Sequence, residues 1–282
     1  GRAIGLFWYY IIPIRRRIAR RNVARVFGTE LSQRAQRRIV RRCFENLCMF
    51  GVEVFRLPTL TQAQSEMLVE RRNWHTLEEA LQRGKGVIVV TAHMGNYDLA
   101  ACSQAIRGVP INAIVKTIHW APAHRFIFGS RERTGLKLIA PQRSKDDIRA
   151  VLKRGEIVVF IIDQHMLPYQ GIVCEFFGQL ASTTPAPTRF ALETGAPIVP
   201  LWIYRKSRSG AHMLCIEPEL VLETPYEDRD ANLRHNTERL NRRVESWIRQ
   251  QPEQWLWLHR RWKVQDNPKG WSIPENLRKV ES

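Results

Sequence analysis

The chain has 282 residues, enough to bury the core of one α/β domain, and no linker or internal repeat divides it. Its 44 lysines and arginines outnumber its 27 aspartates and glutamates, and the formal net charge of +17 points to an anionic partner. The five cysteines form no CxxC pair and the eight histidines form no HExxH-like set. This argues against a disulfide framework and against a metal site.

The N-terminal part of the chain begins with an apolar and aromatic segment, residues 4–14. Its eleven residues are too few to cross a bilayer, which takes about 20. We expect it to lie in the membrane interface, with Trp8, Tyr9 and Tyr10 at headgroup depth. Because the chain starts with glycine rather than methionine, the segment also fits the end of a longer hydrophobic anchor. Residues 1–25 are therefore predicted to form a membrane-associated segment, and residues 26–282 the main domain.

A strongly basic stretch follows, with eleven arginines and a single acidic residue, Glu30, between Arg15 and Arg42. It favours an anionic membrane surface or a nucleic acid, and it fits the positive-inside rule for residues that follow an anchor. A solvated helix face is the alternative interpretation. No RNP, helix-turn-helix or zinc-finger pattern accompanies the nucleic-acid interpretation.

Two amphipathic helices are predicted next, over residues 31–56 and 62–83, ended by Pro58 and Gly84. Apolar runs and helical patterns then alternate, with a loop before residue 185. The predicted strands are 86–91, 111–116, 136–140, 156–162, 197–204 and 212–217, and the predicted helices are 97–107, 121–134, 146–155, 185–194 and 230–250. This alternation predicts a single-domain α/β fold with a mixed, mostly parallel central sheet covered by helices on both sides.

The stretch from Thr91 to Asp98 (TAHMGNYD) places His93 at the carboxyl end of a predicted strand and Asp98 in the first turn of the next helix. In open α/β sheets ligands bind at this edge. An imidazole held by a carboxylate is a general base that can deprotonate a hydroxyl, and the nearby helix N-terminus can supply amides to an oxyanion. Gly95 allows a tight turn, and Asn96 can cap the helix or orient a substrate. From this spacing alone, a structural histidine is the leading alternative.

A second polar pair, Asp163 and Gln164, follows the predicted strand 156–162 at the same sheet edge. It is interpreted as substrate-binding, through a sugar hydroxyl, or as a loop cap. Arg131 and Arg189 are candidates for phosphate binding because the guanidinium fork suits phosphate oxygens, with ordinary surface charge as the alternative. The tryptophans 255, 257 and 262 are expected to pack and to anchor at an interface. Residues 259–261 (HRR) are expected either to bind phosphate or to be structural.

Four segments together resemble the bacterial lipid A biosynthesis (late) acyltransferases of the lysophospholipid acyltransferase superfamily. They are AHMGNYD (92–98), VVFIIDQH (158–165), residues 176–200 from FFG through ASTT to RFALETGAPIVP, and PEQWLWLHRRWK (252–263). The Trp-rich, basic last segment is the most specific, and together the segments span the chain from about Asn22 to Lys263. Many relatives carry glutamate where this chain has Asp98, a departure that bears on the lipid acceptor.

The resemblance implies a membrane-associated O-acyltransferase at the bacterial inner membrane, with its active site facing the cytoplasm. Asp98 would hold the imidazole of His93, and His93 would deprotonate a hydroxyl of a phosphorylated lipid A precursor. The hydroxyl would attack the thioester of acyl-acyl carrier protein or acyl-CoA, with backbone amides near Gly95, together with Asn96, at the oxyanion. Acyl carrier protein, the membrane surface and an anionic glycolipid are the implied partners, and no cofactor or metal is expected. An acyltransferase for a lysophospholipid, glycerol phosphate, phosphoinositol mannoside or aminolipid, and an unrelated nucleic-acid-binding protein, are the alternatives.

Overall fold

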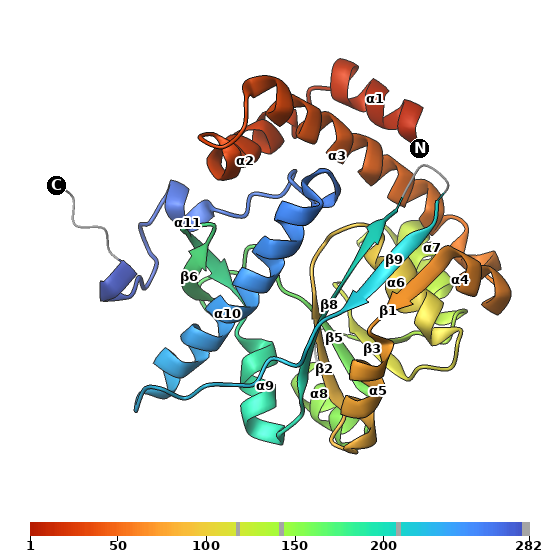
Figure 1. Cartoon of the computed structure of the whole chain (residues 1–282), viewed down its shortest axis with the longest axis vertical. Helices are drawn as coiled ribbons and strands as arrows, with labels where there is room; N and C mark the ends of the chain where they lie inside the picture. The colour runs from red at the N-terminus through yellow and green to blue at the C-terminus, as the bar shows by residue number, and fades with distance from the viewer. Residues whose placement is uncertain (117–118, 141–143, 207–209, 278–282) are drawn as a thin grey trace.

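The computed structural model describes residues 1–116, 119–140, 144–206 and 210–277. A seven-stranded sheet lies at the centre, in the order β1-β9-β8-β2-β5-β3-β4 (Figure 1). Five of its strands run parallel: β2 (Val87–Thr91), β3 (Ile111–Ile114), β4 (Lys137–Ile139), β5 (Ile157–Ile161) and β8 (Ile198–Arg205). β9 (His212–Ile216) pairs antiparallel with β8, and β1 (Val69–Arg72) pairs parallel with β9. The predicted mixed, mostly parallel sheet is therefore confirmed.

Both faces of the sheet are covered, and strand β2 shows why. All five of its residues are buried, as expected for a strand in the middle of a parallel sheet. Because side chains alternate along a strand, Ile88 and Val90 enter one hydrophobic cluster while Val87 and Val89 enter another. The first cluster includes residues of α8 (Ser144–Lys153), α9 (Ala186–Thr194) and α10 (Arg229–Gln250); the second includes residues of α5 (Trp74–Gln82) and α6 (Tyr97–Ala105).

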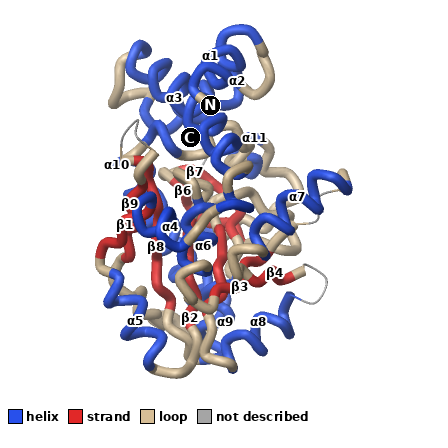
Figure 2. Tube along the Cα trace, turned by 90° about the vertical axis from the view of Figure 1, so that its right-hand side faces the viewer, coloured by secondary structure: helices blue, strands red, loops and turns tan. Residues whose placement is uncertain are grey.

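Three N-terminal helices, α1 (Arg2–Ile11), α2 (Arg16–Phe27) and α3 (Gln33–Val54), gather at one end of the molecule (Figures 1 and 2). The apolar stripe predicted on α3 is largely turned inward, with Ile39, Cys43 and Val54 buried. Gly5 lets α1 approach α3 closely, because a β-carbon there would lie 2.5 Å from the Cα of Glu45. Among the residues that the structure describes, no helix is both long enough and apolar enough to traverse a bilayer.

The predicted helix over residues 62–83 is wrong. The chain instead forms α4 (Gln62–Leu68), the short strand β1, and α5, with Asn73 in the left-handed region at φ 55°. The residues of β1 are extended rather than helical because all of them pair with β9. This non-local pairing overrides a helical pattern that continues across the segment.

The loop expected before residue 185 contains an antiparallel hairpin, β6 (Ile172–Phe176) with β7 (Gln179–Thr183). Its turn consists of Phe177 and Gly178, both with positive φ. The remaining elements are α7 (Ala121–Glu132), α11 (Lys263–Asp266) and the short 3-10 turns at Leu57–Thr59, Pro252–Gln254 and Glu275–Leu277.

Candidate active site

His93 and Asp163 meet at the carboxyl edge of the sheet. β2 ends at Thr91 and β5 at Ile161, and these two residues are partners in the parallel register of the two strands. Two residues beyond each strand end, Nδ1 of His93 lies 2.8 Å from Oδ1 of Asp163, and the His93 amide donates to Oδ2 at 3.0 Å. The parallel register therefore places a carboxylate against one ring nitrogen of the histidine.

The Asp163 carboxylate is buried and fully engaged. Besides the two hydrogen bonds from His93, it accepts one from Nε1 of Trp255 at 2.7 Å. Burial acts to raise the pKa of Asp163, but the His93 imidazole and the Trp255 indole outweigh burial, so the pKa lies below its usual value. A charged Asp163 holds the proton of a neutral imidazole on Nδ1 and leaves a lone pair on Nε2.

The Nε2 atom of His93 faces Gln164, whose side-chain nitrogen lies 3.2 Å away. His93 also lines a small cavity of about 40 Å³ between α3, the histidine turn and the Trp-rich segment. The cavity is lined by Cys43, Asn46, Leu47, Phe50, His93, Gly95, Tyr97, Gln254, Trp255 and Leu256. Because Asp163 occupies Nδ1, Nε2 is the ring nitrogen that remains to accept a proton.

Asp98 does not hold His93, which corrects the predicted pairing. Its carboxylate forms an ion pair with Arg131 of α7, at 2.8 Å from Oδ1 to Nη2. Successive residues of a helix are rotated by about 100°, so adjacent side chains of the first turn of α6 point in different directions. The ring of Tyr97 takes the place beside the imidazole, edge to face at 5.0 Å between ring centroids. Asp98 consequently points toward α7.

Gly95 and Asn96 hold the turn between β2 and α6 through hydrogen bonds to other parts of the chain. The amide of Gly95 donates to the carbonyl of Gln254 at 3.0 Å, so it is not directed at a substrate oxyanion, contrary to the prediction. Asn96 caps α6 as expected, accepting from the Leu99 amide at 2.8 Å, and its side-chain nitrogen donates to Glu53 at 2.7 Å. Because Asn96 is fully buried and both of its polar groups are used, a substrate-orienting role is also corrected.

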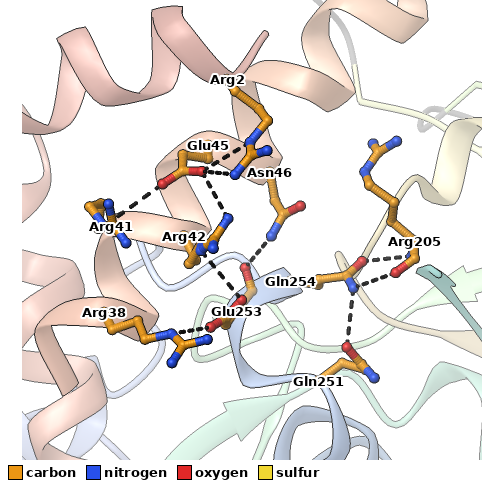
Figure 3. Close-up of polar contacts among 10 residues, drawn as sticks. All are labelled: Arg2, Arg38, Arg41, Arg42, Glu45, Asn46, Arg205, Gln251, Glu253 and Gln254. Atoms are coloured by element: carbon orange, nitrogen blue, oxygen red, sulfur yellow. Dashed lines mark hydrogen bonds and ion pairs between the residues drawn. The ribbon is translucent and has the colours of Figure 1, made fainter. Parts of the chain in front are cut away.

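Glu53 of α3 is a supporting residue that no sequence motif marks. It receives two hydrogen bonds from Arg205 of β8, at 2.5 and 2.8 Å, in addition to the one from Asn96. Arg205 also contacts the segment before Trp255: its backbone amide donates to the side chain of Gln254, and its carbonyl accepts from that side chain (Figure 3). The sequence signal is weak, since a lone glutamate on an amphipathic helix is ordinarily solvent-exposed.

The Trp-rich C-terminal segment forms a wall of the site. Trp255, Trp257 and Trp262 are at most 1% exposed, so the expected packing role is confirmed and the expected interfacial anchoring is wrong. Met94 pairs with Trp255 as an isolated β-bridge, and the Leu256 amide donates to the His93 carbonyl at 3.2 Å. The segment therefore holds the histidine turn through both backbone and side chains.

The three polar residues 259–261 differ in their surroundings. Arg261 is fully buried and donates to the Gln164 carbonyl and to β7 at Ser182 and Thr183. His259 accepts from the His165 amide at 2.9 Å, and burial lowers the pKa of His259 to about 4. Arg260 is exposed, and so is Arg189 on α9, which does not line the His93 cavity. Among the predicted phosphate ligands, Arg131 pairs with Asp98 and Arg261 contacts the backbone of Gln164.

Cys43, the cysteine that lines this cavity, is not activated as a nucleophile. Burial raises the pKa of Cys43 to about 12, and its thiol donates to the Trp255 carbonyl at 3.1 Å. A protonated thiol committed to a carbonyl is a poor nucleophile. The arrangement favours a general base acting on a bound hydroxyl over covalent catalysis.

Comparison with known proteins supplies the family. Residues 1–264 match the sequence model of the bacterial lipid A biosynthesis acyltransferases. A lipid A biosynthesis lauroyltransferase of Escherichia coli K12 is 25% identical over 270 residues, covering 94% of this chain and 84% of the relative.

Other relatives align over shorter stretches. A lipid A biosynthesis acyltransferase of Haemophilus influenzae is 23% identical over 64% of this chain and 55% of its own length. A phosphatidylinositol mannoside acyltransferase of Mycobacterium tuberculosis is 25% identical over 67% of this chain and 61% of its own length. The aligned part of the chain thus spans little more than half the length of the Haemophilus influenzae relative. Because the family match extends from the first residue to beyond the Trp-rich segment, the chain belongs to the bacterial lipid A biosynthesis acyltransferase family.

Proposed function

We propose that this chain is a membrane-associated O-acyltransferase that moves a fatty acyl chain from a thioester donor to a hydroxyl of a lipid A precursor or a related glycolipid. The observation that carries the proposal is the His93–Asp163 pair, which holds the imidazole proton on Nδ1 and leaves the lone pair of Nε2 available on a residue that lines a cavity. Family membership supports acyl transfer as the reaction. Relatives named for lipid A and for phosphatidylinositol mannoside support a glycolipid acceptor.

In the proposed reaction, Nε2 of His93 takes the proton of the acceptor hydroxyl as its oxygen attacks the thioester carbonyl. The tetrahedral intermediate collapses, the carbon–sulfur bond breaks, and the thiolate takes the proton back from Nε2. Asp163 stabilises the imidazolium that exists between these two transfers. The reaction is a direct transfer, so the protein needs no nucleophile of its own.

Gln164 is the proposed donor to the oxyanion. Its amide nitrogen lies 3.2 Å from Nε2, in the place that an acceptor hydroxyl would take. When the hydroxyl binds, this amide must turn away from the imidazole, and its N–H groups remain next to the reacting carbonyl.

Helix α1 supports the proposed membrane association. Ile4, Phe7 and Ile11 recur at helical spacing and are 57%, 57% and 65% exposed. An amphipathic helix with exposed apolar residues beside a basic surface is suited to lie in the interface of an anionic membrane. We accordingly propose that the protein acts at the cytoplasmic side of the inner membrane, where acyl carrier protein or acyl-CoA can deliver the acyl chain.

The test is an acyl-transfer assay with purified protein, read by mass spectrometry. Acyl-acyl carrier protein and acyl-CoA serve as donors, and a lipid A precursor, a phosphatidylinositol mannoside and glycerol phosphate serve as acceptors. We expect an acylated glycolipid with at least one donor, and its loss in His93→Ala with unchanged thermal unfolding. A folded His93→Ala protein with full activity would contradict the mechanism, and product only from glycerol phosphate would contradict the glycolipid acceptor.

A further inference from the structure

A basic groove lies between the N-terminal helices, apart from the His93 cavity. It has a volume of about 1040 Å³, and seven arginines between Arg16 and Arg42 line it together with Tyr9, Tyr10 and Ser32. No acidic side chain belongs to the lining. Guanidinium groups facing one hollow repel one another unless an anion binds there, so the groove is a site for a polyanionic or phosphate-bearing ligand.

Part of this groove is held in place by carboxylates that lie behind it. Glu45, only 2% exposed, pairs with Arg41 and Arg42, and Glu253 pairs with Arg38 and Arg42 (Figure 3). These ion pairs fix the direction of the guanidinium groups. Two carboxylates do not neutralise seven arginines, so the groove keeps a net positive charge.

Two other arginines of the groove have no anionic partner. Within the described residues, Arg34 and Arg37 form no ion pair and no side-chain hydrogen bond, and both are exposed. They are three residues apart on α3 and therefore lie on the same face of the helix. Two unpaired guanidinium groups on one face can bind the oxygens of one phosphate from two sides.

The groove and the His93 cavity share helix α3. Arg38 lines the groove and Asn46 lines the cavity, and eight residues of helix separate them by roughly 12 Å. The two sites also share the segment before Trp255: Glu253 accepts from Asn46 through its carbonyl, and the next residue, Gln254, accepts from the Gly95 amide. A ligand that reaches from one site to the other would place a phosphate in the groove and a hydroxyl at Nε2.

We infer that the groove binds a phosphate group of the lipid acceptor and so positions the acceptor's hydroxyl at His93. This inference rests on the proposed acyl transfer and adds the feature by which the acceptor is selected. It distinguishes a phosphate carried by the acceptor from the general attraction of a basic surface to an anionic bilayer.

The test compares an acceptor lipid before and after phosphatase treatment, in neutral detergent micelles that carry no other anion. Wild-type protein should show a KM at least about ten-fold lower for the phosphorylated acceptor, since hydrogen bonds from charged guanidinium groups to a phosphate are among the strong ones. The double variant Arg34→Glu/Arg37→Glu should bring the ratio of the two KM values close to one. The matched control Arg17→Glu/Arg72→Glu, at exposed arginines outside the groove with the same change in net charge, should keep the wild-type ratio. Equal ratios in all three proteins would overturn the inference.

A binding measurement separates failure of this inference from failure of the proposed reaction. Equilibrium binding of the acceptor lipid in the same neutral micelles, before and after phosphatase treatment, requires no acyl transfer. Binding that depends on the acceptor's phosphate, and is weakened at least about ten-fold in Arg34→Glu/Arg37→Glu but not in the control, supports the groove even if no acyl transfer is found. If the reaction occurs but the two double variants bind alike, the groove assignment is wrong while the proposed function stands.

Discussion

The Nδ1 atom of His93 lies 2.8 Å from Oδ1 of Asp163, a residue 70 positions away in the chain. The carboxylate five residues away, Asp98, instead pairs with Arg131. Two strands in parallel register bring the distant pair together, whereas the near aspartate stands at the start of α6 and is directed toward α7. The catalytic importance of the two aspartates should differ accordingly.

Replacing Asp163 by asparagine should lower kcat by a factor of about 10⁴, the loss that follows when a triad histidine is held in the wrong tautomer. The amide of asparagine can donate to Nδ1, which would shift the ring proton to Nε2 and remove the base. Steady-state acyl-transfer kinetics measure the effect. Asp98→Asn is the matched control and should lose much less activity, while a larger loss in Asp98→Asn would show that Asp98 is the true partner.

The ion pair between Asp98 and Arg131 should contribute to stability, because its two side chains are only 9% and 16% exposed. Arg131→Met leaves a poorly solvated carboxylate without its partner and should lower the free energy of unfolding by roughly 2–4 kcal/mol. The double variant Asp98→Asn/Arg131→Met should recover part of that loss, because no unpaired charge remains. Urea denaturation of the four proteins gives the coupling energy, and additive single effects would mean that the pair contributes nothing.

Gly95 should not tolerate a side chain. Its φ is +57°, and a β-carbon there would lie 2.3 Å from the carbonyl oxygen of Ile203. We expect Gly95→Ala to destabilise the protein by more than about 3 kcal/mol, since backbone strain and a backbone clash add together. Gly84→Ala is the control, with φ +70° but no atom within 4 Å of the added carbon, and should cost only about 1 kcal/mol. Equal melting temperatures for the two variants would contradict the packing of the turn against β8.

His212 should make the fold sensitive to acid. Burial lowers its pKa to about 4, despite the nearby carboxylate of Glu53. Since the unfolded chain binds a proton near pH 6.5 and the folded chain near pH 4, the stability from neutral His212 is complete above pH 6.5 and falls as the pH drops toward 4. The shift corresponds to roughly 2–4 kcal/mol. His212→Leu should therefore flatten the pH dependence of unfolding between these values, and an unchanged slope would show that His212 does not carry it.

Much of the local structure follows from the residues themselves. The β-branched run 87–90 predicts a buried strand, and Asn96 predicts the cap of the following helix. Both features depend on interactions within a few residues, which the sequence displays directly. Of the elements that the patterns do not predict, β1 depends on a partner strand far away in the chain. The β6–β7 hairpin is local, but its turn begins with Phe177, a residue type that does not mark a turn.

The sequence by itself determined that His93 and Asp163 each follow a buried strand, because a short run of apolar residues indicates where such a strand ends. It also determined a family resemblance through the Trp-rich segment 252–263, which the match over residues 1–264 agrees with. Only the tertiary structure decided which aspartate holds the histidine. It also decided that the Gly95 amide and the Asn96 side chain form hydrogen bonds to other protein groups. Those outcomes depend on strand register and on segments such as Glu53 and Gln254 that lie far away in the chain. Local sequence patterns do not specify contacts of that kind, because the geometry of the whole fold sets them.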